Sequence, residues 1–530
     1  MSSDLDSGTS APTEALPNGA SNQIRKGPRF WAILAVLALT SLLTSLEATI
    51  TSTVLPVIVE SLGGGVDYIW VANAYFLTLA ALQPMFGQLS NVFGRRWPMI
   101  FSTAAFLLGS SICGGATSMA MLIGGRVIQG IGGSGISVLV ETVICDLVPL
   151  RERGTYMAIV FGMISLGTAL GPLFGGLIVS YSTWRWAFYL ALPIGGPALA
   201  LLFLFLHVRY DRSSTLAAKL ARLDWLGNAV FVGSSSAMLV ALSWAGGAHP
   251  WSAYQVLVPL LVGAAGLGLF VALEGAAGPG SRVTSLVFAL TFLHGVVTMW
   301  AFYFLPVYFQ GVLGATPYRS GVMLLPTILA LIPAAIAGGL LLTRTGRYKP
   351  LLVAAFALLA VGFGLFSLLD EHSGAGAWAG FQLVESAGAG LAIPTLLPAL
   401  LAPLSDGDTA LATGTWAFAR SFGIVWGVAV AGTLAAGGAY QAAAGRFLDS
   451  LAAETRAQVV AVQSRALQRS WQVAIAFGAL GFVMAVFLKE VPLRRELDSE
   501  FGMTEKGGVV EALASGDLGW GWHTGAMDDG

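Results

Sequence analysis

Four charged residues stand inside long apolar stretches, and they are the first candidates for chemistry. Glu47 and Arg126 interrupt two such stretches in the first half of the chain, and Glu385 and Arg420 interrupt two more in the second half. An ionisable group in such a stretch costs about 2.5–3.5 kcal/mol on insertion scales, so it needs a partner or a water-filled cavity. A carboxylate held by a nearby cation can take up a proton when the two separate. We therefore predict proton coupling at these four residues.

Glu47 and Arg126 are expected at similar depths in the membrane. Glu47 lies about 14 Å from the exterior end of its expected helix and Arg126 about 11 Å from the exterior start of its own, at a rise of 1.5 Å per residue. We predict a switchable pair near a central cavity, in which protonation of Glu47 releases Arg126 and competes with substrate binding. A static structural ion pair is the alternative.

Glu385 and Arg420 are the expected counterpart of this pair in the second half, although their estimated depths agree less well. His294 lies deep in another apolar stretch and can titrate near neutral pH, or simply pack with a hydrogen bond. Glu141 and Asp146 approach the cytoplasmic end of their helix. We expect them to meet loop arginines such as Arg95 or Arg151 in a gate.

These residues must be positioned by membrane helices, as the composition of the chain indicates. Of the 530 residues, 56% are hydrophobic and 10% are charged, against roughly 25% charged in soluble proteins. The net charge of −1 excludes a nucleic-acid binder. The chain is predicted to be an all-α polytopic membrane protein with 14 transmembrane helices. They are expected near 30–58, 67–90, 97–117, 119–143, 155–180, 185–206, 225–245, 254–274, 283–310, 318–343, 350–369, 376–400, 409–436 and 470–488.

The 27 Lys and Arg residues fall mainly in alternate loops, which places both termini in the cytoplasm. Residues 1–28 and 491–530 are polar or Gly-rich and are expected to be disordered cytoplasmic tails. Residues 441–469 carry apolar side chains at helical spacing amid charges, which is typical of an exterior amphipathic segment or of a plain connector. Cys113 and Cys145 fall at opposite membrane faces, so no disulfide or metal site is expected.

The two halves of the chain share a sequence pattern. Gly87 and Gly94 stand seven residues apart before a cluster of cations, and Gly339 and Gly346 repeat this spacing in the second half. We predict two six-helix pseudo-repeated bundles, residues 29–206 and 282–490, joined by a linker with two extra transmembrane helices at 207–281. Such duplication is typical of secondary transporters, whose substrate site lies between the two halves.

Several motifs resemble those of the major facilitator superfamily, and within it the fourteen-span drug:proton antiporters of the fungal efflux type. The segment Gly87 to Arg96 resembles the superfamily's loop motif, and Arg126-Val-Ile-Gln129-Gly130 resembles its fourth-span arginine motif. The segment Gly167-Thr-Ala-Leu-Gly171-Pro172 is similar to the fifth-span motif of antiporters, and its glycines favour close helix packing while its proline favours a bend. The gating and packing residues that these motifs imply are Gly87, Asn91, Gly94, Arg95, Arg96, Gly167, Gly171 and Pro172.

Two positions depart from the pattern of the family. Asn91 stands where the loop motif usually has an aspartate, so it keeps a hydrogen bond and loses the charge. Glu47 stands where the subgroup more often has an aspartate, which preserves the carboxylate.

The resemblance implies proton-coupled efflux of hydrophobic or amphipathic small molecules, such as drugs, toxins or secondary metabolites, by alternating access. Aromatic and amide side chains suit a cavity for such molecules. The cavity candidates from the sequence are Gln83, Trp300, Tyr303 and Gln310. The sequence has no phosphate-binding Gly-x4-Gly-Lys-Ser/Thr loop, so the driving force is expected to be a proton gradient rather than ATP.

The remaining expectations concern enzymatic activity, partners and membrane location. No catalytic residues and no cofactor are predicted, so the chain is not expected to be an enzyme. Its expected partners are the lipid bilayer, protons and a small-molecule substrate, and a monomer suffices for function. The resemblance favours the plasma membrane over the vacuole. The alternatives are a siderophore or basic amino-acid transporter of the same fold, and a non-transporting sensor.

Overall fold

The computed structural model describes residues 27–62, 69–206, 219, 221, 223–245, 249–275, 282–315, 317–435 and 452–494. The first bundle of helices in the chain comprises α1 (Pro28–Leu62), α2 (Ile69–Phe93), α3 (Arg96–Gly114), α4 (Met119–Leu147), α5 (Arg153–Tyr181), α6 (Trp186–Tyr189) and α7 (Ala191–Phe205). Two helices follow it, α9 (Trp225–Trp244) and α10 (Tyr254–Gly275). The second bundle comprises α11 (Arg282–Gly311), α12 (Pro317–Met323), α13 (Leu325–Thr345), α14 (Lys349–Phe366), α15 (Ala375–Leu401), α16 (Thr409–Ala435) and α19 (Ala453–Phe487).

A helix or a pair of helices occupies each of the fourteen ranges that the sequence predicts. Short helices precede two of them, so that α6 with α7 and α12 with α13 each share one predicted range. Within the described residues, eleven helices are long and apolar enough to cross a membrane. The count of fourteen membrane crossings stays a prediction.

The last helix differs from its predicted division into an exterior segment and a span. α19 runs without interruption from Ala453 to Phe487, so the described part of the 441–469 segment continues directly into the final span. The physical reason is that no glycine or proline occurs between Ala453 and Phe477, and nothing there ends the helix. Residues 441–451, 1–26 and 495–530 lie outside the described residues.

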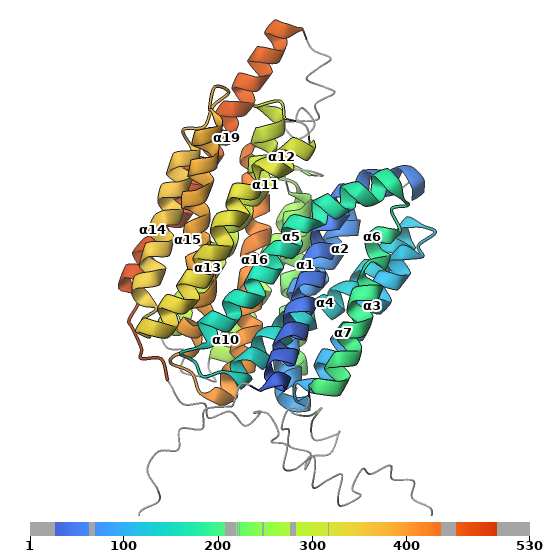
Figure 1. Ribbon diagram of the computed structural model, residues 1–530, viewed down its shortest axis with the longest axis vertical. Coiled ribbons are helices and arrows are strands. Elements are labelled where there is room, and N and C mark those ends of the chain that lie inside the picture. The colour runs from blue at the N-terminus through green and yellow to red at the C-terminus, as the bar shows by residue number, and fades with distance from the viewer. Residues whose placement is uncertain are drawn as a thin grey trace, which may run out of the picture.

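Figure 1 shows two groups of helices, α1 to α7 in blue to green and α11 to α19 in yellow to red. α9 packs against α10 and also contacts α2 and α16, so it touches both groups. α1 begins and α19 ends at the same side of the molecule, at the bottom of Figure 1. We call this side the terminal side, and the sequence predicts that it faces the cytoplasm.

The same close contacts recur in both bundles. In the first, Gly171 on α5 lies against the backbone of α1 at Leu46 and Ile50, and in the second Gly427 on α16 lies against the backbone of α11 at Val296. A side chain at either glycine would collide with that backbone, so both positions bring two helices into direct contact.

The two turns that contain the repeated glycines have the same backbone conformation in both bundles. Gly94 follows α2 with φ 74° and Gly346 follows α13 with φ 68°. This left-handed conformation at a helix end favours glycine because a Cβ would be strained there. The paired spacing of glycines therefore marks two equivalent helix ends on the terminal side.

The bundles meet each other toward the terminal side. Near the start of α5, Gly154 packs against Gly339 on α13, and near the end of α2, Gly87 packs against Gly414 on α16. Backbone contact at these two places holds the halves together there. The space between the halves lies further from the termini.

We expect a substitution at the α1–α5 contact to destabilise the protein. Gly171→Ala should lower the free energy of unfolding by about 1–3 kcal/mol, because the new Cβ must push the α1 backbone aside. Gly176→Ala on the same helix is the matched control, since a Cβ there meets nothing within 4 Å. Thermal unfolding of the purified variants in detergent measures the effect. Equal melting temperatures for the two variants would contradict the packing described here.

Candidate functional site

A cavity of about 240 Å³ lies between the two bundles. Most of its wall is apolar and aromatic, and both bundles contribute, with Phe76 and Phe161 from one and Phe302 and Trp416 from the other. A mostly apolar pocket with few polar groups is the usual form of a site for organic small molecules. The side chains that give it polarity include Gln83, His294 and Arg420.

Glu47 on α1 is buried at 2% exposure and accepts two side-chain hydrogen bonds. Ser110 on α3 donates to Oε2 at 3.0 Å, and Gln129 on α4 donates its Nε2–H to Oε1. Gln129 also donates to the Ser110 hydroxyl at 2.7 Å. The carboxylate is therefore held by neighbours from two other helices of its own bundle.

Arg126 belongs to the same network, through Gln129. Its Nη1 donates to Gln129 Oε1 at 2.6 Å, its Nε donates to the Val71 carbonyl at 2.8 Å, and its guanidinium carbon lies 4.4 Å from the centre of the Tyr75 ring. The direct pair of Glu47 with Arg126 that the sequence suggests is thus replaced by an amide bridge. Gln129 can make this bridge because it follows Arg126 by about one turn and carries both a donor and an acceptor.

The network lies behind the wall of the cavity and does not line it. Tyr75 and Ala48 face the cavity, and they are the immediate neighbours of Arg126 and Glu47. Tyr75 thus separates the Arg126 guanidinium from the cavity. A change in the network can reach a bound molecule through this ring.

Arg420 lines the cavity and pairs with Glu141 across the two bundles. Its Nη2 lies 3.0 Å from Glu141 Oε1, and its guanidinium carbon lies 4.5 Å and 5.2 Å from the ring centres of Trp416 and Phe161. The predicted pair of Arg420 with Glu385 is therefore wrong, and so is the expectation that Glu141 meets a loop arginine. Glu141 lies more than one turn deeper on α4 than Asp146, at a level where α16 rather than a loop is adjacent.

Glu385 occupies a different place in the second bundle. It lies on α15 at 2% exposure, accepts a hydrogen bond from Ser386 at 3.0 Å, and packs against Gly362 on α14. Gln129 packs against Gly109 in the same way in the first bundle. Glu385 is thus the packing counterpart of Gln129, and no cation among the described residues lies within ion-pair distance of it.

The loop motif forms a buried ion pair at the terminal side. Arg95 is 1% exposed, and its Nε lies 2.7 Å from Asp146 Oδ2, as the sequence predicts. Its Nη1 donates to the Ser90 carbonyl at 2.6 Å and to Asn91 Oδ1 at 3.2 Å. Asn91 therefore keeps the hydrogen bond that an aspartate would accept. Arg96 reaches α7 instead, where it donates to the Phe203 carbonyl at 2.9 Å.

Further contacts close the terminal side between the bundles. Arg151 donates to the carbonyl groups of Thr343 and Arg344 at 2.7 and 2.6 Å. Within the second bundle, Arg347 pairs with Glu490 at 3.0 Å, and this hydrogen bond raises the pKa of the Arg347 guanidinium. Access to the cavity from this side is thus blocked in the observed arrangement.

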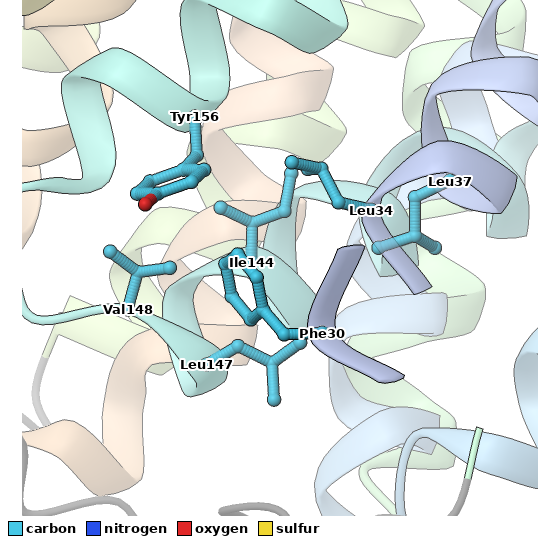
Figure 2. A pocket seen from close by; sticks show the side chains of 7 residues that line it. All are labelled: Phe30, Leu34, Leu37, Ile144, Leu147, Val148 and Tyr156. Carbon is cyan, nitrogen blue, oxygen red and sulfur yellow. The ribbon is translucent and has the colours of Figure 1, made fainter. Parts of the chain in front are cut away.

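A second hollow lies near the terminal ends of α1, α4 and α5, and it cannot hold a substrate. Its volume is about 10 Å³, enough for at most one water molecule. Figure 2 shows the side chains of Phe30, Leu34, Ile144 and Tyr156 converging on it. This region is helix packing rather than a binding site.

Of the cavity candidates from the sequence, one lines the cavity, two do not, and the side chain of one lies outside the described residues. Gln83 lines the cavity. Trp300 and Gln310 do not, because the Trp300 indole donates to Ser470 on α19 at 2.8 Å and Gln310 donates to Ser320 at 3.3 Å near the far end of α11. The side chain of Tyr303 lies outside the described residues, as does that of Pro172.

Two members of the Glu47 network were missed as functional candidates. The spacing of Arg126 and Gln129 on one helix face could have identified Gln129. Ser110 has no such signal, because its position depends on how α3 packs against α4 at Gly109.

A helical membrane protein with a central cavity between two bundles and buried charge networks is the architecture of a transporter. Residues 37–428 match the sequence profile of the Major Facilitator Superfamily. The chain belongs to this superfamily, and it is a multi-pass membrane protein. It is 54% identical over 510 residues to the MFS-type transporter pydD of an Acremonium species, covering 90% of this chain and 89% of the relative. It is 40% identical over 515 residues to the efflux pump FUS6 of Gibberella moniliformis, covering 91% and 92%.

Solved structures support the fold. The human organic anion transporter MFSD10 superposes with a TM-score of 0.60 at 18% identity, covering 87% of this chain and 100% of that one. The proton:xylose symporter XylE superposes with a TM-score of 0.57 at 16% identity, covering 89% and 98%.

The geometry predicts from which side the cavity is reached. A cysteine at Ser165, which lines the cavity on α5, should react with a membrane-impermeant maleimide added outside intact cells. A cysteine at Thr155, which contacts Thr343 across the bundles on the terminal side, is the matched control and should stay unlabelled. The native Cys113 and Cys145 are buried and give little background. Labelling of the Thr155 variant alone would contradict the orientation that the sequence predicts.

Proposed function

We propose that this protein exports hydrophobic or amphipathic small molecules in exchange for protons. The observation that carries the proposal is the cavity between the two bundles, with the buried Glu47 network directly behind its wall. The resemblance to efflux pumps such as FUS6 supports the direction of transport. In this proposal the protein belongs to the fourteen-span antiporter subgroup, needs no cofactor and catalyses no reaction.

Alternating access supplies the mechanism. The two six-helix bundles with α9 and α10 form fourteen membrane crossings, and each bundle moves as a unit because its helices touch backbone to backbone at glycines. The observed arrangement, closed at the terminal side, is then the state that faces the exterior. Separation of Gly154 from Gly339 and of Gly87 from Gly414 opens the other state.

Glu47 is the proposed proton site, with Arg126 as its responsive partner. A protonated Glu47 no longer attracts the Arg126 charge, and the hydrogen bonds that run through Gln129 rearrange. Tyr75 lies against the Arg126 guanidinium and lines the cavity, so the rearrangement changes the wall that a substrate meets. Substrate and proton then favour different states of the protein.

The place of action follows from the same reasoning. Export from the cell requires the plasma membrane, with the terminal side in the cytoplasm as the loop cations predict. One chain contains both halves of the pathway, so a monomer suffices.

A siderophore or basic amino-acid transporter is the second transporter hypothesis from the sequence, and the cavity disfavours its basic amino-acid form. The described lining of the cavity includes Arg420 and no acidic residue, so a cationic substrate would meet a like charge. No described feature favours a sensor.

The test is proton movement in liposomes that contain the purified protein and a trapped pH indicator. Amphipathic aromatic compounds added under an imposed pH gradient should dissipate the gradient through the wild type and through Glu47→Asp. Glu47→Gln should reduce the rate at least about tenfold, because the amide cannot exchange a proton.

The sequence also predicts proton coupling at Glu385, but in the present proposal only Glu47 has this role, because Glu385 is a buried carboxylate that does not line the cavity. Glu385→Gln is therefore the matched control and decides between the two carboxylates. It should transport like the wild type. Full coupling in Glu47→Gln would overturn the assignment of the proton site, and absence of compound-dependent proton movement in the wild type would overturn exchange itself.

A further inference from the structure

We infer that the part of the cavity around Arg420 and Trp416, which we call its floor, binds the acidic head group of an amphipathic organic anion, and that Arg420 releases Glu141 when it binds this group. The inference deepens the proposed function and rests on it, because it names the chemical class of the exported molecule. The class is a hydrophobic carboxylic acid, or a similarly acidic phenol or enol.

The first argument is the charge of the cavity. Among the residues that the structure describes, Arg420 is the one permanently charged side chain that lines it. Its side chain is 17% exposed, and of its five N–H donors one engages Glu141. The faces of Trp416 and Phe161 hold the rest of the guanidinium in place. A fixed cation with spare donors in an apolar pocket attracts an oxyanion.

The second argument is a set of buried polar atoms without partners in the described part of the chain. Both amide atoms of Gln83, the indole nitrogen of Trp416 and Oε2 of Glu141 have no hydrogen-bond partner there. Gln83 is 0% exposed and Trp416 is 1% exposed, and both line the same cavity as Arg420. The Trp416 ring centre lies 4.5 Å from the Arg420 guanidinium carbon. A buried polar group without a partner is costly and calls for an explanation. The two N–H donors suit the oxygens of a carboxylate bound at Arg420.

The third argument is the apolar character of the rest of the cavity wall. Phe76, Phe161 and Phe302 supply aromatic walls that suit an apolar body. The combination of these walls with a cationic floor distinguishes an amphipathic anion from a neutral lipid-like molecule and from an organic cation.

The position of the Glu141–Arg420 pair between the bundles also explains how a bound anion would be released. Glu141 belongs to the first bundle and Arg420 to the second, so separation of the bundles at the terminal side parts them. Arg420 is then free to bind an anion that arrives from the cytoplasm. When the bundles close again, Glu141 competes for Arg420 and displaces the anion toward the exterior. The observed pair at 3.0 Å is the state after release.

The experiment measures binding rather than transport, so it stands apart from the test of proton exchange. Three probes share one aromatic body, namely 2-naphthylacetate, 2-naphthylacetamide and 2-naphthylethylamine. Their dissociation constants are measured by tryptophan fluorescence on the full-length protein in nanodiscs, without a pH gradient.

We expect Glu141→Gln to bind the acetate at least about tenfold more tightly than it binds the amide, because the competing carboxylate is gone and a charged hydrogen bond remains. It should also bind the acetate more tightly than the wild type does, while amide binding stays within about twofold. Arg420→Gln should lose the preference for the acetate. The double variant Glu141→Gln with Arg420→Gln replaces both charges by amides, leaves neither charge unpaired, and should also show no preference.

Arg347→Gln is the control for a lost cation, because Arg347 lies on the terminal side outside the cavity, and its affinities should match the wild type. Equal affinities for the acetate and the amide in Glu141→Gln would overturn the inference. A retained preference in the double variant, tighter binding of the amine, or no binding of any probe would do the same. Failure here with intact proton exchange would leave the proposed function standing.

Discussion

An ionisable group buried among apolar helices must be hydrogen-bonded, paired with an opposite charge or protonated to its neutral form, and this constraint organises the polar interior of the molecule. It explains three polar layers. The Glu47 network lies within the first bundle, the Glu141–Arg420 pair joins the two bundles at the cavity, and the Arg95–Asp146 pair lies at the terminal side. Each layer is a place where a change of partner or of protonation alters which helices are held together.

Close helix packing makes such changes effective over a distance. Glycines on α5 and α16 bring neighbouring helices into backbone contact within each bundle, so a bundle is stiff. The contacts between bundles are concentrated near the terminal side. Stiff halves with a narrow area of contact can exchange one arrangement for another, whereas a uniformly packed core could not.

Much of the fold could be predicted from the sequence because apolar length and the spacing of glycines determine it. The helices and the equivalent turns at Gly94 and Gly346 follow from local patterns. The Arg95–Asp146 pair follows from helix depth, because Asp146 is expected at the same membrane face as the loop that carries Arg95. Partners across helices could not be predicted as well. Counting residues gives the depth of a side chain in the membrane, but not the direction it faces around the helix axis.

Arg420 illustrates this limit, because its depth allowed several acidic partners and only the packing of α16 against α4 selects Glu141. Trp300 illustrates it too, since an indole that faces α19 and one that faces the cavity look alike in sequence. The packing counterpart of Gln129 in the second bundle is Glu385. The sequence repeat places glycines correctly in both halves, but the polar residues between them have diverged.

The most direct test of Glu47 as the proton site is infrared difference spectroscopy of the protein in lipid as the pH is lowered. Protonation of a buried carboxylate produces a carboxylic acid C=O band, and Glu47, Glu141 and Glu385 are all candidates for its source. We predict that a band present in the wild type is lost in Glu47→Gln and retained in Glu141→Gln and Glu385→Gln. Retention in Glu47→Gln, with loss in one of the other two variants, would contradict the coupling mechanism.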